Sequence, residues 1–169
     1  GLQGPAGTAN VLYSAWFAPG TYTVDTIFGV KNFNFFQPAP AITQAILDSG
    51  VVLTYGKLDG YTSVIWPTNQ VALMPIVVTY IEGSTTYTDT WSAYATVDSL
   101  RINFVDNQNL YNGISNAHQF RYVIIPGGMA GASVVAPVAG HMRYTRYTRD
   151  QLRTLPYETI ARLFKIPRD

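Results

Sequence analysis

The chain has 169 residues, of which 47% are hydrophobic and only 12% are charged, and its formal net charge is +1. This length suits one domain with a sizeable core, and the small charge excludes a strong overall attraction to nucleic acid or to an anionic membrane. The absence of cysteine excludes disulfides, thiolate metal sites and cysteine nucleophiles. Abundant tyrosine, threonine and valine favour pleated sheets, so an all-β fold is predicted.

The first residues repeat glycine at every third position. Gly1, Gly4 and Gly7 have the spacing of collagen, in which only glycine fits at the axis of the triple helix. We therefore predict that residues 1–9 are the end of a collagen-like stalk or linker and that residues 10–169 form one globular domain. The alternative is a chance glycine-rich leader. Because three triplets cannot hold a triple helix, a trimer requires the domain itself or further repeats upstream.

The segment before residue 51 predicts a strand, a loop and one short helix. Residues 11–17 are apolar and predict the first strand, whereas residues 32–40 are aromatic, are bounded by proline and predict a loop. Apolar residues at helical spacing predict a helix over about 41–48, which Gly50 ends. We expect one end of the sheet core to be covered by Ile42, Ile46 and Leu47.

Four strands in two hairpins are predicted next. Asp59-Gly60 is a two-residue turn signal, and Glu82-Gly83-Ser84 predicts a second turn. The predicted strands cover residues 51–58, 61–66, 71–81 and 85–97.

Two further strands are predicted over 99–105 and 118–125, on either side of a polar loop at 106–113. Their alternation leaves Arg121 and Val123 on the face away from the core, which is formed by Leu100, Ile102, Phe104, Phe120, Tyr122 and Ile124. Strands at this spacing, with intervening turns, predict an antiparallel β-sandwich.

Residues 127–140 are rich in glycine, alanine and valine and predict a loop across the surface. A C-terminal helix is predicted over about 156–165, with Pro156 in its first turn. Its apolar stripe predicts that the helix docks on the sandwich, through Tyr157, Ile160, Ala161 and Phe164.

Residues 143–149 form a basic arm that repeats Tyr-Thr-Arg with a period of three. Residues 143–169 hold seven basic and three acidic residues, whereas residues 1–142 hold four basic and seven acidic residues. A strand would scatter the arginines over both faces, but a polyproline II-like extension places them along one edge. We predict that the arm lies along its own acidic sheet or a neighbouring protomer, and a solvated basic face is the alternative. The arm supplies five candidate interaction residues: Arg143, Tyr144, Arg146, Tyr147 and Arg149.

The supply of catalytic and metal-binding groups is small. His118 and His141 are the only histidines, and a zinc site needs three or four ligands. Asp89, Asp98 and Asp106 are the only acidic residues expected near a common loop end, and they do not establish a glycosidase pair. We therefore predict no catalytic residue, no metal ligand and no enzymatic activity.

Structural calcium is the only ion that the sequence suggests. The polar loop supplies oxygen atoms of the kind that calcium binds, from Asp106, Asn107, Gln108, Asn109 and Asn112. The spacing matches no calcium loop, and such residues are common in turns for conformational reasons. No cofactor is expected.

Aromatic residues near the predicted hairpins are the remaining candidates for binding. Trp66, Trp91 and Tyr94, together with Tyr61 and Tyr87, could stack on sugar rings or anchor a protein partner. Burial in the core is the alternative for each of them.

Several segments carry a resemblance. Residues 4–16 join collagen-like glycines to Asn-Val-Leu-Tyr-Ser-Ala-Trp, residues 42–55 pass from a helix into a strand, and residues 120–128 contain Tyr-Val-Ile-Ile-Pro-Gly-Gly. The tail has Tyr157-Glu158 and Ile166-Pro167. Together they resemble collagen-like surface lipoproteins of Bacteroidota, a largely uncharacterised family. The resemblance implies an outer-membrane, cell-surface location with a lipid anchor upstream, and it implies no catalytic residues.

These observations predict a non-enzymatic lipoprotein domain of the cell surface. We expect it to bind protein partners of the outer envelope or its own copies, as a trimer if the stalk continues upstream. The membrane contact would be the lipid anchor alone, and no nucleic acid is expected. A carbohydrate-binding module with exposed aromatic residues is the alternative, and an enzyme is a third class.

Overall fold

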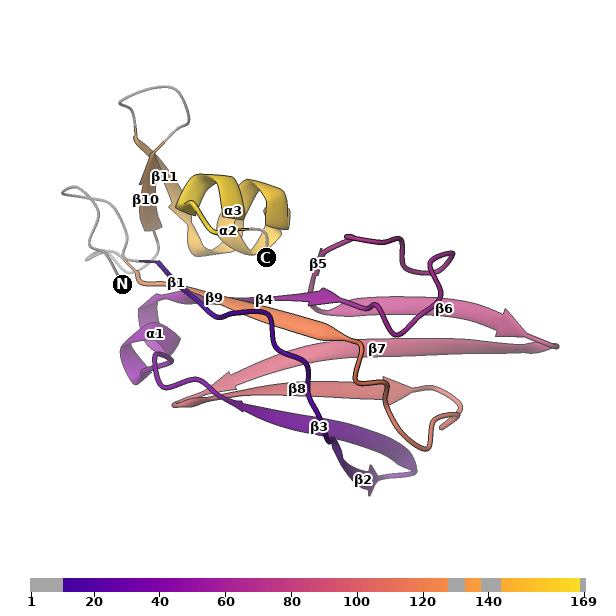
Figure 1. Ribbon diagram of the computed structural model, residues 1–169. Helices are drawn as coiled ribbons and strands as arrows, with labels where there is room; N and C mark the ends of the chain where they lie inside the picture. The colour runs from indigo at the N-terminus through magenta and orange to yellow at the C-terminus, as the bar shows by residue number, and fades with distance from the viewer. Residues whose placement is uncertain (1–10, 128–132, 138–143, 168–169) are drawn as a thin grey trace.

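The computed structural model describes residues 11–127, 133–137 and 144–167. Two antiparallel sheets pack face to face, and the C-terminal helices lie on the outer face of the smaller sheet (Figure 1). The predicted antiparallel β-sandwich with a short internal helix and a C-terminal helix is therefore confirmed. The predicted stalk end, residues 1–9, lies outside the described residues.

The larger sheet has five strands in the order β2-β3-β8-β7-β6. They are β2 (Thr23–Ile27), β3 (Val30–Pro38), β6 (Ile76–Glu82), β7 (Thr85–Thr96) and β8 (Ser99–Asp106). The turn between β6 and β7 lies where it was predicted, and Gly83 has a φ of 65°, which glycine adopts without strain. This turn, the β2–β3 turn and the loop at 107–118 lie at one end of the sandwich, which we call the loop end.

The smaller sheet has the order β1-β9-β4-β5. Its strands are β1 (Leu12–Tyr13), β4 (Val51–Lys57), β5 (Ala72–Leu73) and β9 (Gln119–Ile125), and α1 (Gln44–Ser49) precedes β4. The Thr43 hydroxyl caps α1 by accepting a hydrogen bond from the Ile46 N–H at 3.3 Å. As predicted, the core at this end is covered by Ile42, Ile46 and Leu47.

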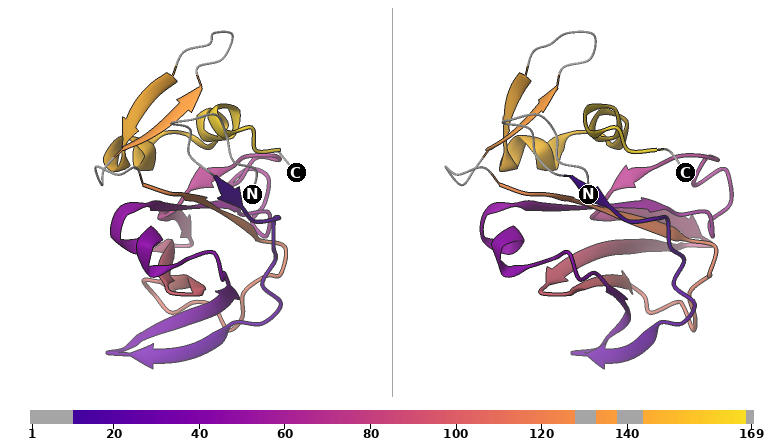
Figure 2. Two further views of the ribbon diagram at one scale, coloured as in Figure 1. Left: turned by 90° about the vertical axis from the view of Figure 1, so that its left-hand side faces the viewer. Right: turned by 60° about the vertical axis from the view of Figure 1, so that its left-hand side comes forward.

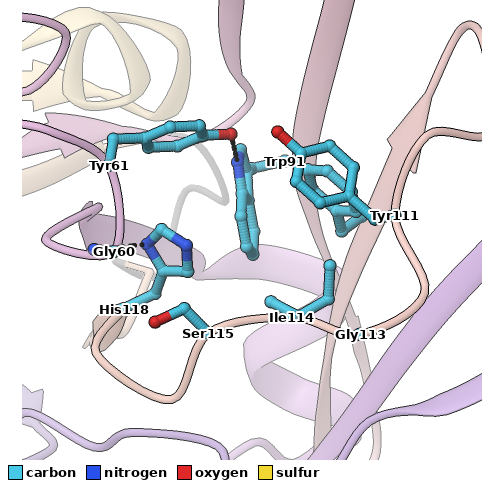
Figure 3. Close-up of a pocket in the computed structure, with 9 residues that line it drawn as sticks. Gly60, Tyr61, Trp91, Tyr111, Gly113, Ile114, Ser115 and His118 are labelled. Carbon is cyan, nitrogen blue, oxygen red and sulfur yellow. Dashed lines mark hydrogen bonds between the residues drawn. The ribbon is translucent and has the colours of Figure 1, made fainter.

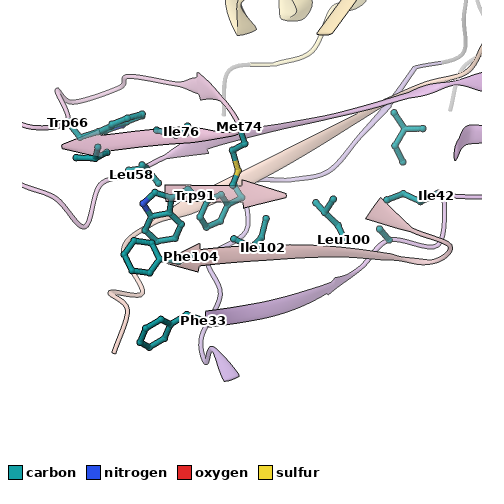
Figure 4. Packing of buried hydrophobic residues seen from close by; sticks show 14 residues of the cluster. Phe33, Ile42, Leu58, Trp66, Met74, Ile76, Trp91, Leu100, Ile102 and Phe104 are labelled. Carbon is teal, nitrogen blue, oxygen red and sulfur yellow. The ribbon is translucent and has the colours of Figure 1, made fainter. Parts of the chain in front are cut away.

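The main core lies between the two sheets (Figure 4). Leu100, Ile102 and Phe104 of β8 are buried, as their alternation predicted, and they face Phe120 and Ile124 of β9 across the sandwich. Burying an aliphatic or aromatic side chain of this size stabilises a protein by about 1.5–3 kcal/mol. This packing fixes the relative position of the two sheets, and therefore the geometry of the loop end.

A second apolar cluster covers the outer face of the smaller sheet. The chain ends with β10 (Ser133–Pro137), β11 (Tyr144–Thr148), α2 (Arg149–Thr154) and α3 (Tyr157–Phe164). The two helices pack on β4 and β9 through Leu152, Tyr157, Ile160 and Ala161, which meet Val51, Leu53, Tyr55, Val123 and Ile125. The predicted docking of the C-terminal helix on its own sandwich is confirmed, and the views in Figure 2 show these helices on the side opposite the larger sheet.

Arg121 lies in this second cluster, although the alternation of β9 placed it on a face away from the core. Its Nη1 donates hydrogen bonds to the Tyr157 hydroxyl at 3.0 Å and to the Pro167 carbonyl. Its guanidinium lies 5.0 Å from the centre of the Trp16 ring, in cation–π geometry. Both faces of β9 are therefore buried, because the C-terminal helices cover the second one.

Two predicted elements are wrong in the first half of the chain. Residues 32–40 were predicted as a loop, but β3 runs to Pro38, its last residue, where the missing N–H removes no bond from the strand interior. Residues 61–66 were predicted as a strand but form turns. The Tyr61 hydroxyl donates to Asp89 at 2.7 Å and the Trp66 indole donates to the Gln70 carbonyl at 3.0 Å, which fixes this segment without a partner strand.

The predicted strand over 71–81 is interrupted at Met74-Pro75. β5 pairs with β4 in the smaller sheet, whereas β6 pairs with β7 in the larger one. Because proline cannot donate to a sheet ladder, one continuous strand is not formed there. The segment instead links the two sheets.

The described parts of the basic arm and of the predicted loop before it, residues 144–148 and 133–137, pair as antiparallel strands. β10 pairs with β11 from Ser133↔Thr148 to Pro137↔Tyr144. The polyproline II interpretation of residues 144–148 is therefore wrong, because the β-branched residues of β10 offer these residues a backbone partner. Arg149 begins α2 instead of ending the arm.

Replacing Thr148 by alanine should destabilise the C-terminal helices. Thr148 accepts a hydrogen bond from the Gln151 N–H at 3.1 Å, and the Gln151 side chain accepts one from the Thr148 N–H at 2.8 Å. Losing such a capping box costs about 1 kcal/mol. Urea unfolding should show this loss for Thr148→Ala, and an unchanged midpoint would contradict the assigned cap.

Candidate functional site

A cavity of about 260 Å³ opens at the loop end of the sandwich. The loop after β4, the strands β7 and β8 and the loop at 107–118 surround it (Figure 3). Its lining is mainly aromatic: Gly60, Tyr61, Trp91, Phe104, Tyr111, Gly113, Ile114, Ser115 and His118.

A hydrogen-bonded network centred on Asp89 lies beside this cavity. Asp89 is 0% exposed, and its Oδ2 accepts hydrogen bonds from the hydroxyls of Tyr61 at 2.7 Å and Tyr111 at 2.6 Å. The Trp91 indole donates to the Tyr61 oxygen at 3.0 Å, and the Tyr80 and Tyr111 hydroxyls are 2.6 Å apart. The network ties the loop after β4 and the loop at 107–118 to β7. Burial raises the pKa of Tyr61 and Tyr111 above the usual tyrosine range.

The structure brings together two of the three acidic residues that the sequence placed near a loop end. Asp89 and Asp106 are cross-strand partners on β7 and β8, whereas Asp98 lies in the β7–β8 turn at the opposite end. Both carboxyls are buried, and each has an Oδ1 without an N–H or O–H donor. Burial and then the Asp106 carboxyl raise the pKa of Asp89 to about 6.

This carboxyl pair is enclosed by its hydrogen-bond donors. The remaining oxygen of Asp106 accepts hydrogen bonds from the backbone N–H groups of Gln108 at 2.8 Å and Leu110 at 3.1 Å. Because Asp106 is only 3% exposed and Asp89 is fully buried, neither carboxyl presents an atom to a substrate in this conformation. The geometry favours a structural role in holding the loop at 107–118.

His118 closes the other side of the cavity. Its Nδ1 accepts a hydrogen bond from the Gly60 N–H at 3.3 Å, and its ring packs 4.7 Å from the Trp91 ring. Burial lowers the pKa of His118 to about 4, so the ring is neutral at pH 7 and Nε2 carries the proton. A Cβ at position 60 would lie 2.6 Å from the imidazole, which explains the glycine there. His141 lies outside the described residues.

Four of the five residues that suggested calcium use a side-chain oxygen in hydrogen bonds of the loop end: Asp106, Asn107, Asn109 and Asn112. The Asn107 Oδ1 accepts from the Thr88 N–H at 2.8 Å, and the Asn109 Oδ1 accepts from the Lys31 N–H at 3.0 Å. The Asn112 Oδ1 accepts from the Lys31 ammonium at 3.4 Å. Among the described residues, no group of three or more His, Cys, Asp or Glu side chains could hold a metal ion.

The three aromatic residues predicted to bind partners have different positions. Trp66 is 5% exposed and Trp91 is 1% exposed, because both pack in the main core, so neither ring lies on the outer surface. Tyr94 is 50% exposed on the outer face of the larger sheet. Its ring lies 4.6 Å from the Arg101 guanidinium, and Phe36, which is 59% exposed, is the cross-strand partner of Arg101 on the other side.

The basic arm is only partly described. Arg143 lies outside the described residues, and Tyr144 and Arg146 are placed as backbone positions of β11. Tyr147 is half-buried against the second cluster. Arg149 donates a hydrogen bond to the Asp48 carbonyl in the last turn of α1, at 3.1 Å. This contact joins the arm to its own domain through a main-chain oxygen rather than through an acidic side chain.

The sequence analysis missed the most exposed apolar feature, the hairpin of β2 and β3. Phe28 and Gly29 form its two-residue turn, with φ of 47° and 83°, and Phe28 is fully exposed. Its neighbours Ile27 and Val30 are also exposed. Positive φ at both positions marks a type I′ turn, for which asparagine followed by glycine is favoured and phenylalanine is strained. Gly29, which follows a run of mostly β-branched residues over 23–27, was the signal of this turn in the sequence.

The tip of this hairpin is held in place by the loop at 107–118. The Asn109 side chain donates to the Gly29 carbonyl at 2.8 Å and accepts from the Lys31 N–H at 3.0 Å. The Lys31 ammonium also donates to the Tyr111 carbonyl at 3.4 Å. The Asp89 network, which anchors Tyr111, therefore supports the hairpin tip as well.

No protein family model, curated protein or solved structure matches this chain. In the described part of the chain, the helices are too short and too polar to cross a membrane.

Proposed function

We propose that this chain is a non-enzymatic interaction domain of the cell surface, which binds protein partners through the β2–β3 hairpin. The supporting observation is Phe28, a fully exposed aromatic residue held in a strained turn. Its positive φ is unfavourable for folding, and its exposed ring adds no packing that would offset this cost. Such a residue is explained when a partner covers it.

The arrangement of the hairpin suits a binding surface. Aromatic residues dominate the binding energy of many protein interfaces. Because Asn109 and Lys31 already hold the tip in place, little conformational freedom is lost when a partner binds. An interface centred on Phe28 would also cover the neighbouring exposed residues, Ile27 and Val30.

The position of the hairpin fits the proposed attachment to the outer membrane. β1 pairs with Val123 and Ile124 near the end of β9, whereas the hairpin tip lies at the loop end, from which β9 starts. The β2–β3 hairpin thus projects away from the C-terminal helices in Figure 2. A lipid anchor and stalk before Val11 would therefore join the domain at the end of the sandwich opposite Phe28.

Phe28→Asn tests this proposal without weakening the fold. The change creates the Asn-Gly pair that type I′ turns favour, so stability should be equal to or higher than that of the wild type. Mass spectrometry of complexes recovered from native envelope that carries a second, differently tagged copy of the chain should show a loss of at least about tenfold in the specific partners, that copy included, as expected for an aromatic hot spot. The matched control is Phe36→Asn, which removes an exposed phenylalanine from the outer sheet face and should retain the partners.

Retention of all partners by Phe28→Asn, with loss in Phe36→Asn, would overturn the assignment of the hairpin. It would favour the second candidate, a carbohydrate-binding module. That candidate rests on the row formed by Phe36, Arg101 and Tyr94 on neighbouring strands. Because Phe36 and Tyr94 lie two strands apart, their backbones are separated by about 9–10 Å. A glycan array would then show binding that Tyr94→Ala abolishes, and an array without hits would remove this candidate.

A further inference from the structure

β2 is an edge strand of the larger sheet, and all five of its residues are exposed. It pairs with β3 without interruption from Thr23↔Asn34 to Ile27↔Val30, and among the described residues no backbone hydrogen bond joins β2 to another segment. Folded proteins usually protect such an edge with lysine, proline, a bulge or a covering segment. Within the described ranges of the chain β2 has none of these, and it carries a single charge, at Asp25.

The sequence of β2 is self-complementary in one register. Antiparallel pairing of two β2 strands about Asp25 would set two carboxylates directly opposite, which is destabilising. Pairing about Val24 would leave Phe28 beyond the contact. Pairing about Thr26 sets Asp25 opposite Ile27 and brings Val24 beside Phe28, at both ends of the contact. Because the two-fold axis repeats the contact, the exposed apolar residues of both copies are covered, at each end of the paired strands.

We propose that the partner of the β2–β3 hairpin is a second copy of this chain, paired β2 to β2 across a two-fold axis at Thr26. This inference rests on the proposed function and specifies its partner. The same surface meets itself, so assembly through this contact stops at two copies instead of forming a fibre.

The charges of the hairpin also favour a protein strand over a lipid surface. An anionic membrane attracts lysine and arginine. The hairpin carries only Asp25 and Lys31, and the Lys31 ammonium is bonded to the Tyr111 carbonyl and the Asn112 side chain. The hairpin therefore offers backbone donors and acceptors with apolar side chains, which is what a second strand pairs with.

Single cysteines test the register, because the chain has no cysteine of its own. Across a dyad at Thr26, the two Cβ atoms would be about 4.5–5.5 Å apart, close to the separation that a disulfide bridges. Thr26→Cys in a glutathione redox buffer should give a disulfide-linked dimer as the main species. The matched control is Thr79→Cys on β6, the other edge strand of the same sheet, which should remain monomeric.

Sedimentation equilibrium of the cysteine-free chain provides the second measurement. The wild type should show a monomer–dimer equilibrium, and Phe28→Asn should raise the dissociation constant at least about tenfold. A Thr26→Cys variant that remains monomeric, or a Thr79→Cys variant that cross-links equally well, would overturn the proposed dimer. If the dimer fails but Phe28→Asn still loses envelope partners, the hairpin binds a different protein. If the chain does not dimerise and Phe28→Asn also retains all envelope partners, the proposed function fails together with the dimer.

Discussion

Replacing Ile160 by alanine is expected to lower the free energy of unfolding by about 2–5 kcal/mol, the usual cost of truncating a buried isoleucine. Ile160 is fully buried between α3 and the outer face of the smaller sheet. The α3 helix has eight residues and is not stable alone, so its contribution comes from this packing. Urea unfolding followed by circular dichroism measures the loss.

Arg162→Ala is the matched control on the exposed face of the same helix. This change should alter the free energy of unfolding by less than about 0.5 kcal/mol. If Ile160→Ala unfolds with the wild-type midpoint, the C-terminal helices are not part of the cooperative unit. The buried position of Arg121 would then need another explanation.

Two buried groups, Asp89 and His118, should have opposite effects on how the free energy of unfolding changes with pH. The pKa of Asp89 in the folded protein is about 6, above its usual 3.8, so Asp89 contributes stability at low pH that is lost as the pH rises towards 6. The pKa of His118 is about 4, below its usual 6.5, so folding binds fewer protons there and stability increases over the range from about 4 to 6.5. In the wild type the two effects largely cancel.

Single substitutions separate these effects. Asp89→Asn should leave the His118 effect, so that the free energy of unfolding rises with pH between about 4 and 6.5, by on the order of 1–2 kcal/mol relative to the wild-type profile. His118→Asn should leave the Asp89 effect, and the free energy of unfolding should then fall between about 4 and 6. Urea titrations at several pH values give both profiles. Parallel profiles for the wild type and both variants would contradict the assigned pKa shifts.

The periodic parts of the sequence predicted their structure well. In β8, Leu100, Ile102 and Phe104 alternate with polar residues, and this pattern is decisive because only one face of the sheet meets the main core. The stripe on α3 succeeded for the same reason, since one helix face is buried. Two-sided burial was harder to predict: β9 has a second apolar cluster on its other face, and its Arg121 looked like a surface residue.

The wrong predictions of strands and loops arise where residues far apart in the sequence interact. Residues 32–40 were predicted as a loop because they are aromatic and bounded by proline, but β3 pairs with β8, where the Asn103 amide donates hydrogen bonds to Asn32 and Asn34. Asp59-Gly60 has turn chemistry, yet Tyr61 bonds to Asp89 on β7 and starts no strand. Sequence patterns do not reveal such partners, because they lie many positions away in the chain.

The candidate site was predicted only in part. The tryptophans singled out for binding are core residues, since a sandwich with many aromatic residues must bury most of them. Phe28 was missed because turn rules favour asparagine there, so a phenylalanine gives no turn signal. A residue that breaks a local rule without a gain in packing is the kind of position where function is expected.

Amide hydrogen exchange of the native envelope assembly, compared with the isolated domain at a concentration at which it is monomeric, tests the central claim most directly. Residues 23–30 of the β2–β3 hairpin should gain protection in the assembly, because a partner strand satisfies the free edge of β2 and covers Phe28. The outer face around Tyr94 and the edge strand β6 should exchange at unchanged rates. Protection confined to β6 or to the strands that carry Phe36 and Tyr94, with no change at residues 23–30, would contradict the account.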